Sequence, residues 1–174
     1  YLVENRKHIR GLILTHGHED HIGATPYVLS QLDLPIYTTR FTGALVNRKL
    51  KEHDLPKQPT IHIVEPGDKV SLGCFEIELI RVTHSIPDAA ALAIKTPLGV
   101  VLHTADFKID PTPIDGQLFD LHALADYGQK GVLLLLSDST NVNRSGFTPS
   151  EQAVRPRLKE IFHHANNSLY FSCF

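Results

Sequence analysis

The chain has 174 residues, of which 42% are hydrophobic and 21% charged, as expected for one globular domain with its own core. Its formal net charge of -2 excludes an overall basic surface for nucleic acid, so a polyanion would need a local positive site such as bound metal ions. The two cysteines form no disulfide framework, and no apolar run reaches membrane-spanning length, so we predict a cytoplasmic protein without a membrane partner.

Strands and helices alternate in the first third of the chain. Residues 11–15 form a short apolar run that predicts a buried strand. Residues 24–32 have the apolar spacing of a helix, with Pro26 in the first turn, where a missing N–H costs little. Residues 35–39 then predict a second strand, and residues 41–53 a second helix.

The middle of the chain is rich in predicted strands. Residues 60–64 and 75–80 alternate apolar and polar side chains, which predicts strands with one solvated face. Residues 91–96 and 99–103 are separated by the short turn at residues 97–98, which predicts a hairpin.

The last part of the chain continues this pattern. Residues 131–136 are continuously apolar after their glycine, which predicts a strand buried on both faces. Thr148 and Glu151 form a capping box for a final helix, which Pro156 should kink. Residues 168–171 begin another strand. The alternation of strands and helices predicts an α/β sandwich.

The motif HGHEDH, residues 16–21, directly follows the first predicted strand. Imidazoles and carboxylates are usual zinc ligands in catalytic sites. In an extended turn the first two histidines can hold one ion, and the aspartate and last histidine can reach a second. The alternative is a solvated histidine-rich loop, which the position after a buried strand disfavours. The motif therefore predicts a dinuclear metal site.

Further ligands are expected where other strands end. His84 follows the strand at 75–83, and Asp106 follows the strand that ends near residue 104. Alone, these would be an ordinary strand-end histidine and a turn-forming aspartate, but the HGHEDH motif makes both candidate ligands. His103 lies within its strand, and we interpret it as structural.

Three features resemble, in this order, the second, third and fourth motifs of the metallo-β-lactamase superfamily: HGHEDH, His84 and Asp106. Three longer segments resemble the ribonuclease J family, in the β-CASP branch of nucleases: VTHSIPDA, HTADFKID and SDSTN. The resemblance implies an α/β fold of the αββα sandwich type that is present here in part. Residues 1–166 would be a partial metallo-β-lactamase domain that lacks N-terminal strands and the β-CASP insertion. Residues 167–174 would begin the β-CASP domain.

The resemblance also implies roles for individual residues. One zinc ion would be held by His16, His18 and His84. The other would be held by Asp20, His21 and Asp106, with Asp106 bridging. Asp20 and Asp106 would also act in catalysis by lowering the charge of the site and positioning water. Asp138, in SDSTN, would act as the family's acid that supports a distant histidine, although a turn residue at a strand end is the alternative. Mn²⁺ accepts the same ligand types as Zn²⁺.

The implied activity is hydrolysis of RNA phosphodiester bonds, by endonuclease and 5′→3′ exonuclease action, in RNA maturation and decay. The resemblance implies a homo-oligomer, dimer or tetramer, for the full-length protein. It also implies an inactive isolated chain, because two further functional histidines of the family have no counterpart here. The alternatives are another hydrolase of this fold, acting on DNA, thioesters or lactones, and an inactive scaffold paralogue in an RNA-processing assembly. The SIPD and SDSTN segments disfavour thioesters and lactones, and the six filled ligand positions disfavour the scaffold.

Overall fold

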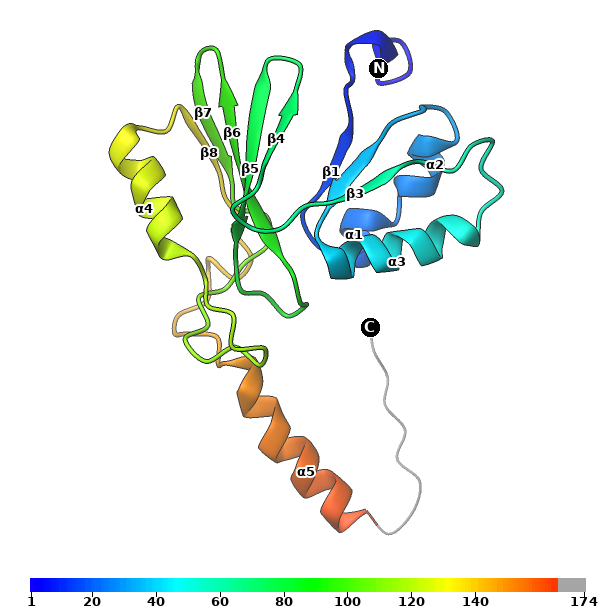
Figure 1. Ribbon diagram of the computed structural model, residues 1–174. Helices are drawn as coiled ribbons and strands as arrows, with labels where there is room; N and C mark the ends of the chain where they lie inside the picture. The colour runs from blue at the N-terminus through cyan, green and yellow to red at the C-terminus, as the bar shows by residue number, and fades with distance from the viewer. Residues whose placement is uncertain (166–174) are drawn as a thin grey trace.

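The computed structural model describes residues 1–165. Two sheets lie face to face, with helices α1 to α3 on the outside of one sheet and α4 on the outside of the other (Figure 1). This is the α/β sandwich that the sequence predicted. The strand expected at residues 168–171, and the expected start of a second domain at 167–174, lie outside the described residues.

The smaller sheet contains three parallel strands: β1 (Leu12–Leu14), β2 (Ile36–Thr38) and β3 (Ile61–Ile63). Three helices connect these strands: α1 (Glu19–Ile22), α2 (Thr25–Leu29) and α3 (Arg40–Lys51). Apolar side chains of β1, β2 and the helices form one core, which includes Leu14, Ile36, Val46 and Leu50. The helix expected at residues 24–32 is present in its first part as α2. The short helix α1 was not predicted, and it begins inside the HGHEDH motif. A 3-10 turn (Arg6–His8) precedes β1.

The larger sheet contains five strands in sequential order: β4 (Lys69–Leu72), β5 (Phe75–Arg81), β6 (Ala90–Thr96), β7 (Gly99–His103) and β8 (Leu134–Leu136). Neighbours are antiparallel except β7 and β8, which are parallel. The hairpin predicted at residues 91–103 is confirmed as β6 and β7. Helix α4 (Leu121–Lys130) contributes Ala123, Leu124 and Tyr127 to the core on the outer face of this sheet.

Alternate side chains of β5 enter two different cores. Ile77 and Leu79 pack between the sheets, whereas Ile80 packs toward α4. The expectation of one solvated face therefore holds only for the first half of β5, where Glu76 and Glu78 are partly exposed. In the second half, α4 and its connecting loop cover the outer face.

The prediction that residues 131–136 form a strand buried on both faces is wrong. In β8, Leu134, Leu135 and Leu136 are all exposed, as is the preceding Leu133. Strand β8 is the edge strand and pairs only with β7, and none of the hydrophobic cores formed by the described residues includes its leucine side chains.

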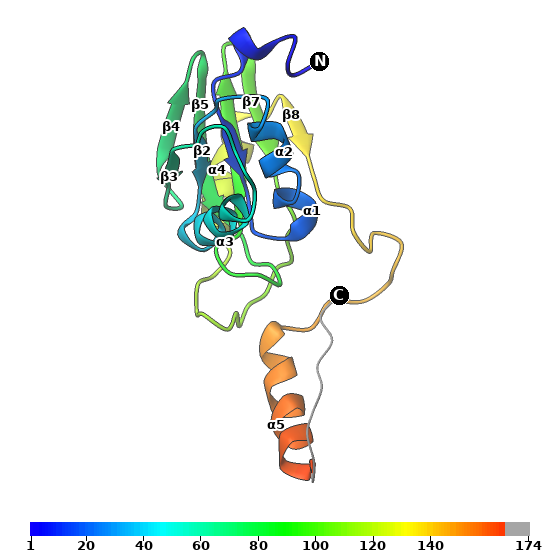
Figure 2. The same ribbon diagram turned by 90° about the vertical axis from the view of Figure 1, so that its right-hand side faces the viewer.

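The final helix begins differently from the prediction. Ser150, rather than Thr148, caps the first turn by accepting a hydrogen bond from Gln152 N. A 3-10 turn (Glu151–Ala153) then leads into α5 (Val154–His164). The expected kink at Pro156 is absent: α5 is drawn as one straight helix (Figure 1), and Pro156 lies in its first turn, where the helix needs no N–H donor at this position. Helix α5 extends away from the sandwich (Figures 1 and 2). No described helix is long and apolar enough to cross a bilayer.

Candidate metal centre

The predicted ligands follow the ends of strands from both sheets. The segment after β1 carries His16 and His18, and helix α1 carries Asp20 and His21. In the larger sheet, His84 lies three residues after β5, and Asp106 lies three residues after β7. The two sheets thus bring residues that are 90 positions apart in the sequence to the same edge of the sandwich.

The candidate ligand atoms form two groups, and within each group they lie within 4.8 Å of one another. The groups are His16, His18, His84 and Asp106, and Asp20, His21 and Asp106. Asp106 is common to both: its Oδ2 lies 3.4 Å from His21 Nε2 and 3.9 Å from Nε2 of both His16 and His84. His84 Nε2 and His18 Nδ1 are 3.1 Å apart. The structure therefore brings the six predicted ligands together; their binding of metal stays a prediction.

His16 forms the buried floor of this cluster. Its side chain is fully buried, and its Nε2 is the only buried side-chain nitrogen or oxygen without a hydrogen-bond partner among the described residues. Its Nδ1 lies 3.1 Å from the Thr15 hydroxyl. The tautomer in which Nδ1–H donates to this hydroxyl leaves a free lone pair on Nε2. An unpartnered buried polar atom costs about 1–3 kcal/mol, which a bound cation would offset.

Two histidines of the cluster, His16 and His84, are held in the neutral form that binds metals. Burial is the largest cause that lowers the pKa of His16 to about 4, and the neighbouring His21 and His84 lower it further. Burial is also the first cause of the lowered pKa of His84, followed by His18, while Asp106 acts in the opposite direction. Neutral imidazoles combined with carboxylates give a donor set that attracts a divalent cation.

The donor types fit a catalytic zinc site. Four imidazoles and two carboxylates converge, and the cluster is open on one side, because the Asp20 side chain is 78% exposed while His16 is fully buried. Zinc in catalytic sites takes this combination of nitrogen and oxygen ligands and leaves a position open. The residues present therefore fit the metal pair that the sequence predicted, and Mn²⁺ is compatible with the same donors.

Asp138 lies beside the cluster and outside both ligand groups. Its Oδ1 accepts a hydrogen bond from Thr140 N at 2.7 Å, and its Oδ2 one from Phe107 N at 3.5 Å. Partial burial acts to raise the pKa of Asp138, but these hydrogen bonds, together with His84, outweigh it and hold the pKa below its usual value. Asp138 is thus an ionised neighbour of the loop that carries Asp106.

Three buried threonines precede the ligand segments, and the sequence analysis did not single them out. Thr15 contacts His16, Thr83 is adjacent to His84, and Thr104 precedes Ala105 and Asp106. The signal that could have identified them is the repetition of threonine at the end of each ligand-bearing strand.

The residue directly before Asp106 has a strained backbone. Ala105 has a φ of 53°, in the left-handed region that residues with a Cβ rarely adopt. Two hydrogen bonds stabilise this turn: the Thr104 hydroxyl donates to Ala105 O at 2.8 Å, and Ala105 N donates to His103 Nδ1 at 3.1 Å. Such strain is concentrated at functional sites, and here it turns the chain so that Asp106 faces the histidines.

Comparisons with known proteins place this geometry in a family. Over the whole chain, the sequence is 52% identical to ribonuclease J of Synechocystis, 42% identical to ribonuclease J of Thermus thermophilus and 36% identical to ribonuclease J2 of Bacillus subtilis. The chain spans 28%, 32% and 31% of the length of these relatives, respectively.

The fold has solved counterparts. A protein of unknown function from Enterococcus faecalis superposes with a TM-score of 0.60 at 20% identity, over 87% of this chain and 38% of that one. Zn²⁺-bound PqqB from Methylobacterium extorquens gives a TM-score of 0.51 at 12% identity, over 57% of this chain and 39% of that one. The family model of the metallo-β-lactamase superfamily matches residues 1–141. The chain therefore belongs to the metallo-β-lactamase superfamily, and it is similar throughout its length to ribonuclease J.

Proposed function

We propose that this chain is the metal-binding part of a ribonuclease that hydrolyses RNA phosphodiester bonds with two divalent cations. Zn²⁺ is the first candidate for these cations. The observation that carries the proposal is the shared carboxylate: Asp106 lies within reach of both ligand groups, each of which contains at least one histidine. The similarity to ribonuclease J proteins supports RNA as the substrate.

The position of each residue in the cluster determines its proposed role. His16, His18 and His84 would hold one ion, and Asp20 and His21 the other, with Asp106 between them. The chemistry that such a pair of ions supplies when bound is activation of water at neutral pH and neutralisation of charge on a phosphoryl group. The side chains supply the frame for this chemistry, because His16 closes the floor of the site and Asp20 stands at its solvent-exposed rim.

This arrangement suits a long polymeric substrate. The rim at Asp20 is open to solvent, so a phosphodiester within a chain can approach the cluster from outside. The overall charge of -2 offers no broad basic surface, and the backbone phosphates would therefore be attracted locally by the ions. We propose cleavage both within RNA and from its 5′ end, with the Asp138 carboxylate as a further group that assists beside the cluster.

The test uses the natural full-length protein, because the chain represents a minor part of its relatives. Three substrates of one sequence are compared: circular RNA, linear 5′-monophosphorylated RNA and the corresponding DNA. We expect both RNAs to be cleaved and the DNA to be spared. Cleavage of circular RNA reports internal cutting, since a circle has no ends. Activity should disappear with a chelator and return with Zn²⁺ or Mn²⁺.

Two matched variants complete the test. Asp106→Asn should abolish cleavage, whereas Asp33→Asn should leave it intact, because Asp33 is an exposed residue whose carboxylate pairs with Lys57 at 2.6 Å. Preferential cleavage of DNA would favour the DNA-nuclease alternative. A full-length protein that binds fewer than about one ion per chain and cleaves none of the substrates would favour the scaffold alternative.

A further inference from the structure

Two loops that carry candidate ligands are joined next to the metal centre. Thr83 precedes His84, and Lys108 lies two residues after Asp106. Their backbones form an isolated antiparallel bridge, in which Lys108 N donates to Thr83 O at 2.8 Å. The Thr83 hydroxyl donates to Lys108 O in return. These contacts connect one ligand from β5 with one from β7.

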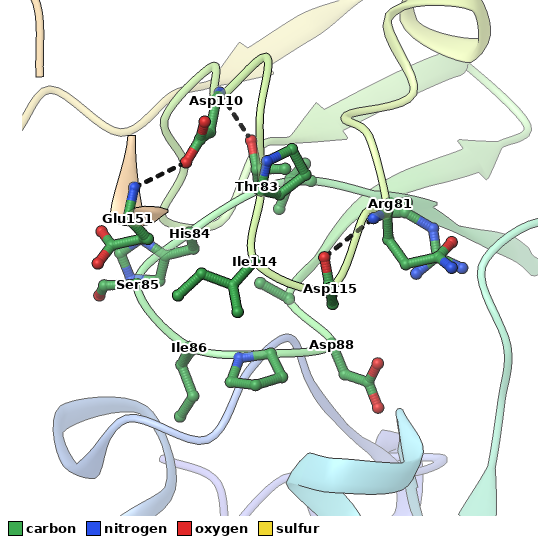
Figure 3. A pocket seen from close by; sticks show the side chains of 15 residues that line it. Arg81, Thr83, His84, Ser85, Ile86, Asp88, Asp110, Ile114, Asp115 and Glu151 are labelled. Carbon is green, nitrogen blue, oxygen red and sulfur yellow. Dashed lines mark hydrogen bonds between the residues drawn. The ribbon is translucent and has the colours of Figure 1, made fainter. Parts of the chain in front are cut away.

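Asp110 adds a second link to the same junction. Its backbone N donates to the Thr83 hydroxyl at 3.1 Å, so that this hydroxyl is both donor and acceptor (Figure 3). The Asp110 side chain is buried, yet its carboxylate accepts three hydrogen bonds: from Thr112 N at 2.9 Å, Ser150 Oγ at 2.9 Å and Glu151 N at 3.0 Å. The loop after Asp106 is thereby attached to the segment that leads into α5.

The negative charge of Asp110 is stabilised by hydrogen bonds and by a cation of the protein itself. Burial acts to raise the pKa of Asp110, but the hydrogen bonds from Thr112, Glu151 and Ser150, and then Lys108, outweigh it, so the pKa lies below its usual value. The Lys108 ammonium also pairs with Glu151 and donates to Pro149 O at 3.2 Å. Because the Asp110 oxygens already accept hydrogen bonds from their neighbours, this carboxylate is suited to holding the loops together rather than to binding a ligand.

The junction forms one side of a cavity of about 160 Å³ next to His84 (Figure 3). Arg81, Ile86 and Ile114 are among the other residues that line it. His84 thus borders open space on this side. The hydrogen bonds of Thr83 are the direct restraint on the chain immediately before this ligand.

We propose that Thr83 and Asp110 are positioning residues of the metal centre, which set the separation between His84 and Asp106 through the Thr83 hydroxyl. This inference rests on the proposed function, since it assumes that both ligands bind metal. Groups that orient metal ligands from outside the coordination shell contribute roughly 10-fold to 100-fold to metal affinity. We expect an effect of this size when the hydroxyl is removed.

The test compares Co²⁺ binding and the Co²⁺ visible absorption spectrum in full-length protein. Thr83→Val removes the hydroxyl and keeps the branched shape, whereas Thr83→Ser keeps the hydroxyl. Thr96→Val is the matched control, because the Thr96 hydroxyl also donates to a carbonyl, Gly99 O at 2.8 Å, and accepts from an amide, Leu98 N at 3.1 Å, at the far end of the same sheet. Thermal unfolding is followed for every variant.

We expect Thr83→Val to weaken Co²⁺ binding roughly 10-fold to 100-fold and to change the spectrum. Thr83→Ser and Thr96→Val should match the unsubstituted protein. Asp110→Asn serves as the second variant if Thr83→Val does not fold, and it should change the spectrum in the same direction. Unchanged affinity and spectrum in a folded Thr83→Val protein, or an equal loss in Thr96→Val, would overturn the positioning role alone. Failure of the unsubstituted protein to bind Co²⁺ would overturn the metal site itself, and the positioning role with it.

Discussion

The stability of the metal-free protein should fall when the pH is lowered from 7 to 5, because His16 is buried in its neutral form. Burial, followed by the neighbouring His21 and His84, lowers the pKa of His16 from 6.5 to about 4. Between these two values the unfolded chain binds a proton at this position and the folded chain does not. The free energy of unfolding therefore decreases as the pH falls below 6.5, and most of this decrease has occurred by pH 4.

The size of this effect follows from the two pKa values. One pKa unit corresponds to about 1.4 kcal/mol, so the full difference is on the order of 3 kcal/mol. At pH 5 the unfolded histidine is almost fully protonated and the folded one is mostly neutral, which gives a loss of about 2 kcal/mol relative to pH 7. His84, whose pKa is also lowered by burial, acts in the same direction.

The assay is urea unfolding at pH 7, 6 and 5 in the presence of a chelator, followed by far-UV circular dichroism. His16→Gln is the matched variant, because glutamine is polar and neutral over this range. Other groups titrate in both proteins, so the difference between the two pH profiles isolates His16. We expect the unsubstituted protein to lose about 2 kcal/mol more than His16→Gln. Identical pH profiles for the two proteins would refute the reasoning.

Three other substitutions have defined outcomes. Asp106→Asn should reduce the bound metal from about two ions to at most one per chain, because this carboxylate belongs to both ligand groups; metal analysis after gel filtration that still found two ions would contradict this. Gly17→Ala should destabilise the protein by about 1–3 kcal/mol in thermal unfolding, because the added Cβ would lie 2.5 Å from Leu45 Cδ1. The same substitution should weaken zinc binding in calorimetry, and an unchanged zinc affinity would argue against a tightly packed ligand turn. Tyr127→Phe should cost about 1 kcal/mol in urea unfolding, since it removes the hydroxyl that donates to Glu78 at 2.7 Å, and a neutral result would mean that this contact is exchanged freely with water.

Local sequence patterns predicted most of the strands near the site. The runs that became β1, β2, β5, β6 and β7 are short and apolar or alternating, and this property belongs to the segment itself. Strand β4 was not predicted: Lys69–Leu72 alternates polar and apolar residues over only four positions, and its pairing with β5 is seen only in the structure. The burial of β8 was predicted wrongly for a related reason: composition shows that a strand is apolar, whereas only its neighbours decide whether it is covered.

For the candidate site, too, some features could be predicted from the sequence and others could not. HGHEDH, together with a histidine and an aspartate at later strand ends, predicted a two-metal site with six candidate ligands, because metal ligation depends on donor types that the sequence displays directly. The division of these ligands into two groups that share Asp106 was implied by the resemblance to the metallo-β-lactamase superfamily. The distances among these atoms, the unpartnered nitrogen of His16 and the links from Thr83 to Lys108 and Asp110 were decided by the tertiary structure. The physical reason is that burial and hydrogen bonding depend on residues that are far apart in the chain and meet only when the two sheets pack.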